Sequence, residues 1–294
     1  MTDQSFYKSG ENWWHTPLMV IVAGCTIAML GFGIRSVLGL FLQPMTEANG
    51  WTRETFALAM AIQNLLWGIG LPIAGIWVDK SGPRYVLILG ALAYALGLYG
   101  MANANSGFLL QLTGGVIAGT GIAFTAFSLM LAAMVKVVGT EKRSFILGLG
   151  TAAGSLGQVI FSPISQGMIA QLGWYSALLI LASLCLVIIP LALLLPKAET
   201  SSTFLRSEQT LTEALYEALS HRGYVLLTVG FFVCGFHVAF ITVHFPAYIR
   251  DLGLDPLIGA YCISIVGFFN IAGSLLSGFF GHRYSKKMGL AGIY

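Results

Sequence analysis

Long apolar segments recur along most of this chain of 294 residues, and they constrain its fold more than any other feature. Two of them, Phe56–Trp77 and Tyr85–Met101, are separated by a short charged turn at Asp79–Arg84. An apolar run of about 20 residues is long enough to cross the hydrocarbon core of a bilayer as a helix. We therefore expect a chain that crosses a membrane repeatedly, with tight polar turns at the membrane faces.

The composition agrees with lipid as the solvent. Hydrophobic residues make up 56% of the chain and charged residues only 9%, whereas soluble domains carry about 25% charged residues. The 36 glycines are typical of membrane helices that pack closely, and the GxxxG pairs Gly115/Gly119 and Gly150/Gly154 are interpreted as such contacts. The fold class expected is an all-α polytopic membrane protein.

The expected spans alternate with short polar connections and lie at about Pro17–Met45, Thr52–Val78, Arg84–Ala104, Phe108–Val138, Arg143–Leu172, Trp174–Leu195, Gly223–Leu252 and Pro256–Gly281. Residues 1–16 form a polar tail, 17–195 a bundle, 196–222 a polar central loop and 223–294 the start of a second bundle. Within the loop, leucines at four-residue spacing predict an amphipathic surface helix over Ser207–Ser220. Met288–Tyr294 is interpreted as the first turns of a ninth helix.

Lysine and arginine predict the orientation. With the N-terminal tail in the cytoplasm, nearly all basic residues of the loops lie inside, and only Arg53 and Arg250 lie outside. This bias follows the positive-inside rule. Arg35 is the one basic residue within a predicted span.

The segment Gly75–Arg84 resembles the loop between helices 2 and 3 of the major facilitator superfamily, with the pattern G-x-x-x-D-[RK]-x-G-[RX]-[RK]. The matching residues are Gly75, Asp79, Lys80, Gly82 and Arg84, and a weaker copy occupies Gly278–Lys287. The resemblance implies a complete six-helix N-terminal bundle followed by the first two helices of a second bundle. It also implies that this loop holds the two halves together, with Asp79 meeting helix 11. Surfaces of helices 1, 2, 4 and 5 are then expected to remain exposed and apolar.

The stretches GIRSVLGLFLQPM, GWTRETFALAMAIQNLLWGIG and TAAGSLGQ are similar to the bacterial monocarboxylate and oxalate–formate porters. This similarity implies a secondary transporter of a small mono- or dicarboxylate in the bacterial inner membrane, by proton symport or anion exchange. The family arginine of helix 4 is replaced by Gly115, and the basic residue of helix 8 has no match near Asn270.

Helices 1 and 7 align as repeats, with Gly33 on Gly235, Arg35 on His237 and Pro44 on Pro246. In this fold the two halves are related by an axis along the membrane normal. We therefore expect Arg35 and His237 to face each other across a central cavity.

Arg35 is the principal candidate for binding an anion, because no carboxylate in the predicted spans could neutralise it. The alternative is a structural arginine satisfied by carbonyls or by Gln63 or Asn64 of helix 2. His237 is interpreted either as a ligand or proton carrier or as a hydrogen-bonded core histidine. Gln63, Asn64, Gln158 and Asn270 could orient a substrate, although for each alone an interhelical hydrogen bond is the favoured interpretation.

Other function classes are less well supported by the residues. Cys25, Cys185, Cys234 and Cys262 lie in apolar segments without metal-ligand spacing. No enzyme, cofactor, metal or nucleic-acid partner is expected; the expected partners are the anion, possible coupled protons and the lipid bilayer. Two alternatives remain open: a membrane sensor or assembly protein of the same fold, or an inactive fragment, since the chain is expected to lack the last helices of the fold.

Overall fold

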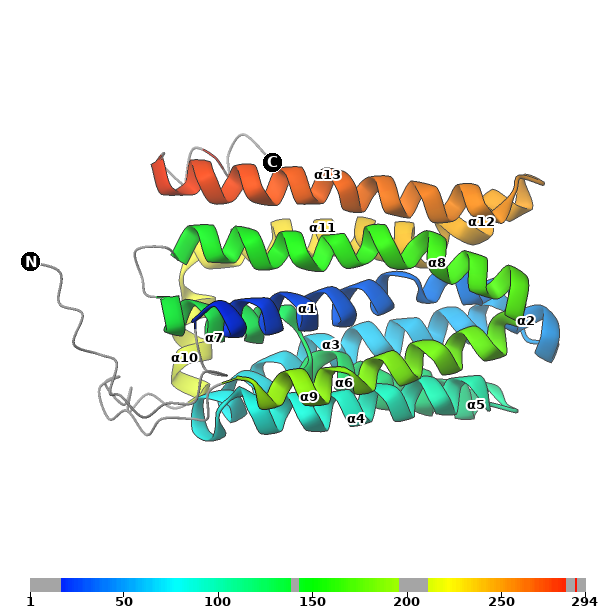
Figure 1. Ribbon diagram of the computed structural model, residues 1–294, viewed down its shortest axis with the longest axis horizontal. Coiled ribbons are helices and arrows are strands. Elements are labelled where there is room, and N and C mark those ends of the chain that lie inside the picture. Colours follow the sequence, from blue (N-terminus) through cyan, green and yellow to red (C-terminus); the bar gives the residue numbers. More distant parts are fainter. Residues whose placement is uncertain (1–16, 139–142, 196–210, 284–288, 290–294) are drawn as a thin grey trace, which may run out of the picture.

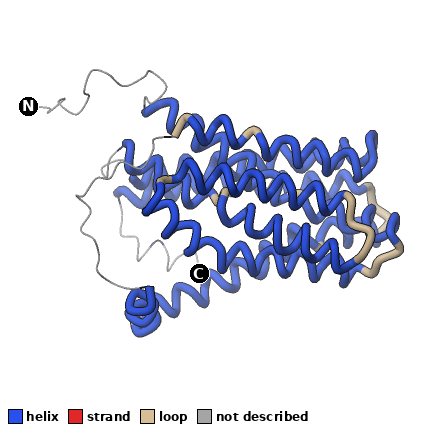
Figure 2. The backbone as a smooth tube through the Cα atoms, turned by 90° about the horizontal axis from the view of Figure 1, so that it is seen from below, coloured by secondary structure: helices blue, strands red, loops and turns tan. Residues whose placement is uncertain are grey.

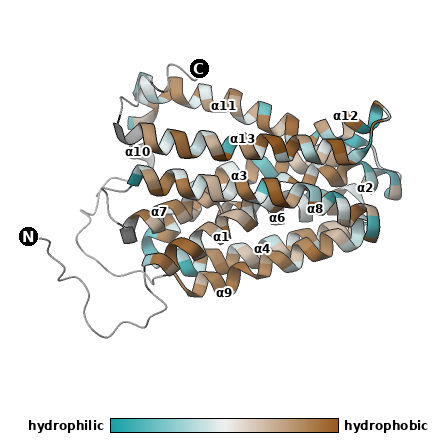
Figure 3. Ribbon diagram, turned by 45° about the horizontal axis from the view of Figure 1, so that its top comes forward, coloured by the Kyte–Doolittle hydropathy of each residue, from teal (hydrophilic) through white to brown (hydrophobic). Residues whose placement is uncertain are grey.

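The computed structural model describes residues 17–138, 143–195, 211–283 and 289. Within these ranges every regular element is a helix (Figure 2). The long helices lie side by side along one axis (Figure 1), and most of their length is apolar (Figure 3). Among the described residues, seven helical segments are long and apolar enough to cross a membrane: Pro17–Asn49, Arg53–Ser81, Pro83–Ala102, Gly107–Leu131, Arg143–Leu193, Arg222–Val243 and Pro256–Phe280.

The longest of these segments contains two spans. It comprises α8 (Arg143–Leu186) and α9 (Ile188–Leu193), but Gly173 inside α8 has φ 80° and ψ 161°. That backbone region is open essentially to glycine alone, so the helix is interrupted there, and the chain turns back on itself (Figure 1). Gly82 adopts nearly the same conformation, φ 79° and ψ 165°, between α3 (Arg53–Ser81) and α4 (Pro83–Ala102). The helix boundary predicted between Leu172 and Trp174 agrees with this turn.

Besides the one-residue turn at Val187 between α8 and α9, three predicted continuous helices are broken in the structure. Helix 1 consists of α1 (Pro17–Ser36), the 3₁₀ turn η2 (Leu38–Phe41) and α2 (Leu42–Asn49). Helix 7 consists of α11 (Arg222–Val243) and α12 (Phe245–Asp251). The breaks lie shortly before Pro44 and Pro246, which have no backbone N–H to continue the helical ladder. The prediction of continuous helices was therefore wrong at these two points.

Helix 4 is the third broken helix. It consists of α5 (Gly107–Leu110), the π-helical turn η3 (Gln111–Ile117), α6 (Ala118–Phe124) and α7 (Phe127–Val138). The Thr125 hydroxyl donates to the Gly121 carbonyl at 2.8 Å beside the last break. Such local competition for helical carbonyls bends helices.

Glycines set the closest contacts within the first bundle. A Cβ on Gly33 of α1 would lie 2.9 Å from the Cα of Gly157 in α8. A Cβ on Gly119 would lie 2.8 Å from the Gln63 carbonyl oxygen of α3, and one on Gly115 would lie 3.1 Å from that of Ala59. The pair Gly115/Gly119 therefore makes the close helix contact that its spacing predicts.

The helices that follow the first bundle pack unequally against it. α13 (Pro256–Arg283) lies along α8, where a Cβ on Gly278 would lie 3.3 Å from the Gly148 Cα. In α11, by contrast, only Thr242 and Val243 are buried. The short helix α10 (Leu211–Ser220) precedes α11.

Apolar surface remains exposed, as predicted, on helix 2. Leu65, Ile69 and Ile73 of α3 are all exposed, and a Cβ on Gly75 would meet nothing within 4 Å. Within the described residues the fold is thus an all-helical polytopic one. The predicted ninth helix falls outside the described residues except for Gly289, as does most of the charged end of the second loop copy.

Candidate functional site around Arg35

Arg35 lies in the last turn of α1 and is held by α3. Its Nη2 donates to Asn64 Oδ1 at 2.7 Å, and its Cζ lies 4.1 Å from the centre of the Trp67 ring. The amide of Asn64 is itself oriented, because Nδ2 donates to the Met60 carbonyl at 2.9 Å. Asn64 and Trp67 are three residues apart, so a helix presents them on one face. The guanidinium is therefore fixed in position by a neutral amide and an aromatic ring.

The guanidinium group of Arg35 is held in one orientation, but its charge is not neutralised. In the described part of the chain no carboxylate forms an ion pair with it. The side chain is partly exposed, and its remaining N–H groups have no hydrogen-bond partner among the described residues. A guanidinium offers five donors in a planar fork that matches a carboxylate. The arrangement can thus hold a small anion by charge-assisted hydrogen bonds.

Two further polar groups near this site were not found by sequence reasoning. Trp67 Nε1 and the Tyr94 hydroxyl are buried without a hydrogen-bond partner among the described residues. Tyr94 belongs to α4 and is close enough to Arg35 to interact with it electrostatically. Buried donors are normally paired, so each of these is a group that a ligand or water would satisfy. The spacing of Trp67 from Asn64 was a usable signal, but nothing in the sequence singles out Tyr94.

Of the other polar residues expected to orient a substrate, two make interhelical hydrogen bonds. Gln63 Nε2 donates to the Gly114 carbonyl at 2.8 Å. Gln158 Nε2 donates to the Ile263 carbonyl of α13 at 3.1 Å. Both side chains are buried, so their amide groups hold helices together, as the alternative interpretation stated. Asn270 is exposed on α13.

His237 lies on the exposed part of α11. Its Nδ1 is 2.9 Å from the Val233 carbonyl of the same helix. Because a carbonyl only accepts, this contact requires the proton on Nδ1 and leaves Nε2 to accept a hydrogen bond or a proton. His237 is exposed among the described residues, and its placement opposite Arg35 stays a prediction.

The residues of the loop motif Gly75–Arg84 have different surroundings in the structure. Gly82 makes the turn between α3 and α4, and Arg84 Nη2 donates to the carbonyls of Leu193 and Leu195 at the end of helix 6. Asp79 and Lys80 are exposed. Arg84 therefore ties the motif to helix 6, a contact that sequence reasoning did not predict.

Comparison with known proteins adds independent evidence. The family model described as "Major Facilitator Superfamily" matches residues 23–294. The chain is 27% identical over 264 residues to monocarboxylate transporter 13 of Rattus norvegicus, covering 90% of the chain and 60% of the relative. It is 25% identical over 268 residues to monocarboxylate transporter 4 of Mus musculus, covering 88% of the chain and 56% of the relative.

The fold is similar to a solved structure of the nucleoside transporter NupG (D323A mutant). The TM-score is 0.69 at 15% identity, covering 90% of the chain and 69% of that structure. The chain spans about 60% of the length of the curated relatives it matches.

Proposed function

Because the chain belongs to the Major Facilitator Superfamily, we propose that it acts in secondary transport of a small organic anion of the mono- or dicarboxylate class, by alternating access. Its similarity to proteins named monocarboxylate transporters supports this substrate class. The positive-inside rule supports a cytoplasmic N-terminus and, with it, a position of α12 on the outer side of the membrane. A plasma membrane location, in bacteria the inner membrane, is part of the same proposal.

The observation that carries the proposal is the uncompensated charge of Arg35. An arginine in the middle of a span costs about 3 kcal/mol by insertion scales. Asn64 and Trp67 position the guanidinium without cancelling its charge. A site whose field is positive favours anions over cations and neutral sugars.

His237 is proposed to carry the coupled proton if transport is proton symport. Its accessible Nε2 and its position in the repeat support this role. Histidine is the side chain that commonly takes up and releases protons in this kind of role. His237→Gln should then retain substrate binding but flatten the pH dependence of transport between about pH 5 and 8. An unchanged pH profile would remove His237 from the mechanism.

The experiment is uptake of labelled lactate and oxalate by the purified chain in proteoliposomes, with labelled choline as the cationic comparison. Arg35→Ala should weaken apparent affinity about tenfold to hundredfold, because a charge-assisted hydrogen bond contributes about 1.5–3 kcal/mol. Arg35→Lys should recover part of this loss, since a planar fork becomes a point charge. Arg143→Ala, an exposed arginine at the start of α8, is the matched control.

Uptake of choline in preference to the acids, or an Arg35→Ala affinity equal to wild type, would refute the anion assignment. Specific binding of the acids without uptake would favour a sensor of the same fold.

A further inference from the structure

The first bundle (residues 17–195) and the helices after it (α11–α13) meet along α8 and α13 and also at the end that holds α2 and α12, here called the α12 end (Figure 1). A Cβ on Gly39 in η2 would overlap the carbonyl oxygen of Thr242 in α11. Pro246 has no N–H to donate to this carbonyl, so the helix leaves it available. Glycine is thus required at position 39 for the backbones of helices 1 and 7 to meet.

An ion pair crosses between the same two parts at the rim of this end. Arg53, the first residue of α3, donates through Nη1 and Nη2 to the two carboxylate oxygens of Asp251, both at 2.6 Å. Asp251 is the last residue of α12, 198 positions along the chain. The side chains are 51% and 42% exposed, so water can reach the pair and its free energy is small.

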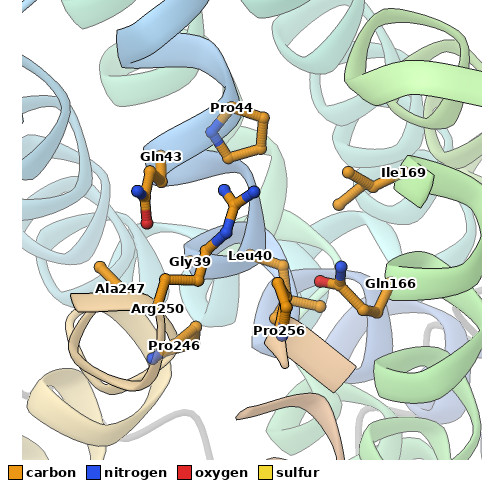
Figure 4. Close-up of a pocket in the computed structure, with 10 residues that line it drawn as sticks. All are labelled: Gly39, Leu40, Gln43, Pro44, Gln166, Ile169, Pro246, Ala247, Arg250 and Pro256. Carbon is orange, nitrogen blue, oxygen red and sulfur yellow. The ribbon is translucent and has the colours of Figure 1, made fainter. Parts of the chain in front are cut away.

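The seam between the two parts is incompletely packed beside this ion pair. A small recess lies between η2, α2, α8, α12 and the start of α13, and Arg250 extends into it toward Gln43 and Pro44 (Figure 4). Gln43 Oε1 is buried there without a hydrogen-bond partner among the described residues. Such a seam is easier to separate than a close-packed core.

Beyond the α12 end, α11 has little contact with the bundle, since its buried residues are confined to Thr242 and Val243. Both helices that meet at the seam are interrupted close to it, at Val37–Phe41 and at His244. Interruptions of this kind absorb the dihedral changes of hinge motions. The α12 end therefore has the parts of a gate: a close contact, a loosely packed seam and a break in each helix.

We infer that the Arg53–Asp251 ion pair is a latch that favours the closed over the open arrangement of the α12 end. The inference rests on the proposed function only in assigning this opening to alternating access. A water-exposed pair suits a latch, because a contact worth about 0.2–1 kcal/mol biases an equilibrium without locking it. Breaking the pair should raise the ratio of open to closed molecules about 1.4- to 5-fold.

The test measures distances by double electron–electron resonance across the seam in the purified chain without substrate. Spin labels replace Ala48 and Leu254, both exposed at the α12 end, after the native cysteines are replaced. Arg53→Ala and Asp251→Asn should each increase the population at longer distances. The exchange Arg53→Asp with Asp251→Arg should restore the wild-type distribution, and Glu54→Gln, on the neighbouring exposed residue, should leave it unchanged.

Salt concentration provides a second test, because about 1 M salt screens the attraction between two exposed charges. The salt should shift the distance distribution of the wild type toward that of Arg53→Ala. It should change the distance distribution of Arg53→Ala itself very little. If the cysteine-free chain does not fold, hydrogen exchange of residues 37–43 in the cysteine-containing chain replaces the distances, and it should be faster in both single variants. The latch would be overturned if the label distances and the hydrogen exchange were both unchanged in the two single variants. It would also be overturned if the charge-swapped double variant behaved like the single variants.

The latch and the transport proposal fail separately. A distance shift in a chain that transports no carboxylate would leave the latch standing and refute the proposed function. Carboxylate uptake with unchanged distances in all variants would refute the latch alone.

Discussion

Gly33 in α1 and Gly157 in α8 meet backbone to backbone across the centre of the first bundle. A Cβ on Gly33 would lie 2.9 Å from the Gly157 Cα, and one on Gly157 would overlap the carbonyl oxygen of Met29. Neither obstacle is a flexible side chain that could move away. This contact fixes how closely α1 approaches α8, and so where α1 places Arg35.

Gly157→Ala should therefore destabilise the protein by about 1–3 kcal/mol, the usual cost of overpacking. Thermal unfolding in detergent, followed by circular dichroism, measures the change. Gly167→Ala is the matched control, since it lies in the same helix and its Cβ would meet nothing within 4 Å. That control should be neutral or stabilising, because alanine has the higher helix propensity. Equal melting temperatures for Gly157→Ala and wild type would contradict the packing described.

Arg84→Ala should destabilise the end of helix 6. Arg84 donates to two terminal carbonyls, at Leu193 and Leu195, which have no further helical turn to supply donors. We expect a loss of about 1 kcal/mol or more in the free energy of unfolding, with partial recovery in Arg84→Lys. The measurement is again thermal unfolding, and Lys80→Ala, exposed in the same motif, should have little effect on it. The prediction fails if both alanine variants melt alike.

Trp67→Leu should weaken binding of the anion. The ring supports the guanidinium of Arg35 at 4.1 Å, and such cation–π contacts contribute about 0.5–2 kcal/mol. The expected loss in affinity for lactate or oxalate is about two- to thirtyfold, measured by equilibrium binding. Trp67→Tyr should retain most of the affinity. Trp77→Leu removes a tryptophan of the same helix that packs against Phe124 instead, and a loss there as large as in Trp67→Leu would count against a specific role.

The balance between the open and closed arrangements of the α12 end should not change across the physiological pH range. The hydrogen bonds from Arg53 hold the pKa of the Asp251 carboxyl below its ordinary value. A carboxyl whose pKa is lowered in the closed arrangement stabilises that arrangement at pH above the unperturbed pKa of about 3.9. The contribution is lost only as pH falls through the lowered pKa.

Distances between the labels at positions 48 and 254 should accordingly be constant from about pH 8 to 5 and lengthen only below about pH 4. The charged and titratable groups around the pair are Arg53, Glu47, which acts on Arg53 electrostatically, Arg250 beside Asp251, and His244 at the break before α12. Asp251→Asn should show no acid transition of this kind. A transition between pH 5 and 8 in the wild type would contradict control by the Arg53–Asp251 pair.

Most of the fold prediction depended on the lengths of the apolar segments and on the positions of glycines. Apolar runs of bilayer length located the spans, and the predicted boundary at residue 173 agrees with a turn that requires glycine. The breaks at Val37–Phe41 and His244 were not predicted, although Pro44 and Pro246 mark where a helical hydrogen bond is missing. A proline shows that a carbonyl is left free but not which backbone will approach it. The π-helical turn at Gln111–Ile117 has no comparable local signal.

The candidate site was predicted less completely. Arg35 could be found because a charge within an apolar span is costly and rare, and Asn64 was named in advance as a residue that could satisfy it. Trp67 and Tyr94 were not found, because an aromatic side chain in a membrane span is ordinary until its neighbours are known. The facing of Arg35 and His237 across a cavity stays a prediction from the repeat alone.

The near absence of buried residues in α11 has a consequence for how the protein is made. A helix that buries little more than Thr242 and Val243 is held in the bilayer by its own apolar length rather than by its neighbours. During synthesis the six spans before it can enter the membrane and pack before α11 leaves the ribosome. Packing within the first bundle therefore depends little on α11, and mutations within α11 should affect assembly of the halves without affecting biogenesis of the first.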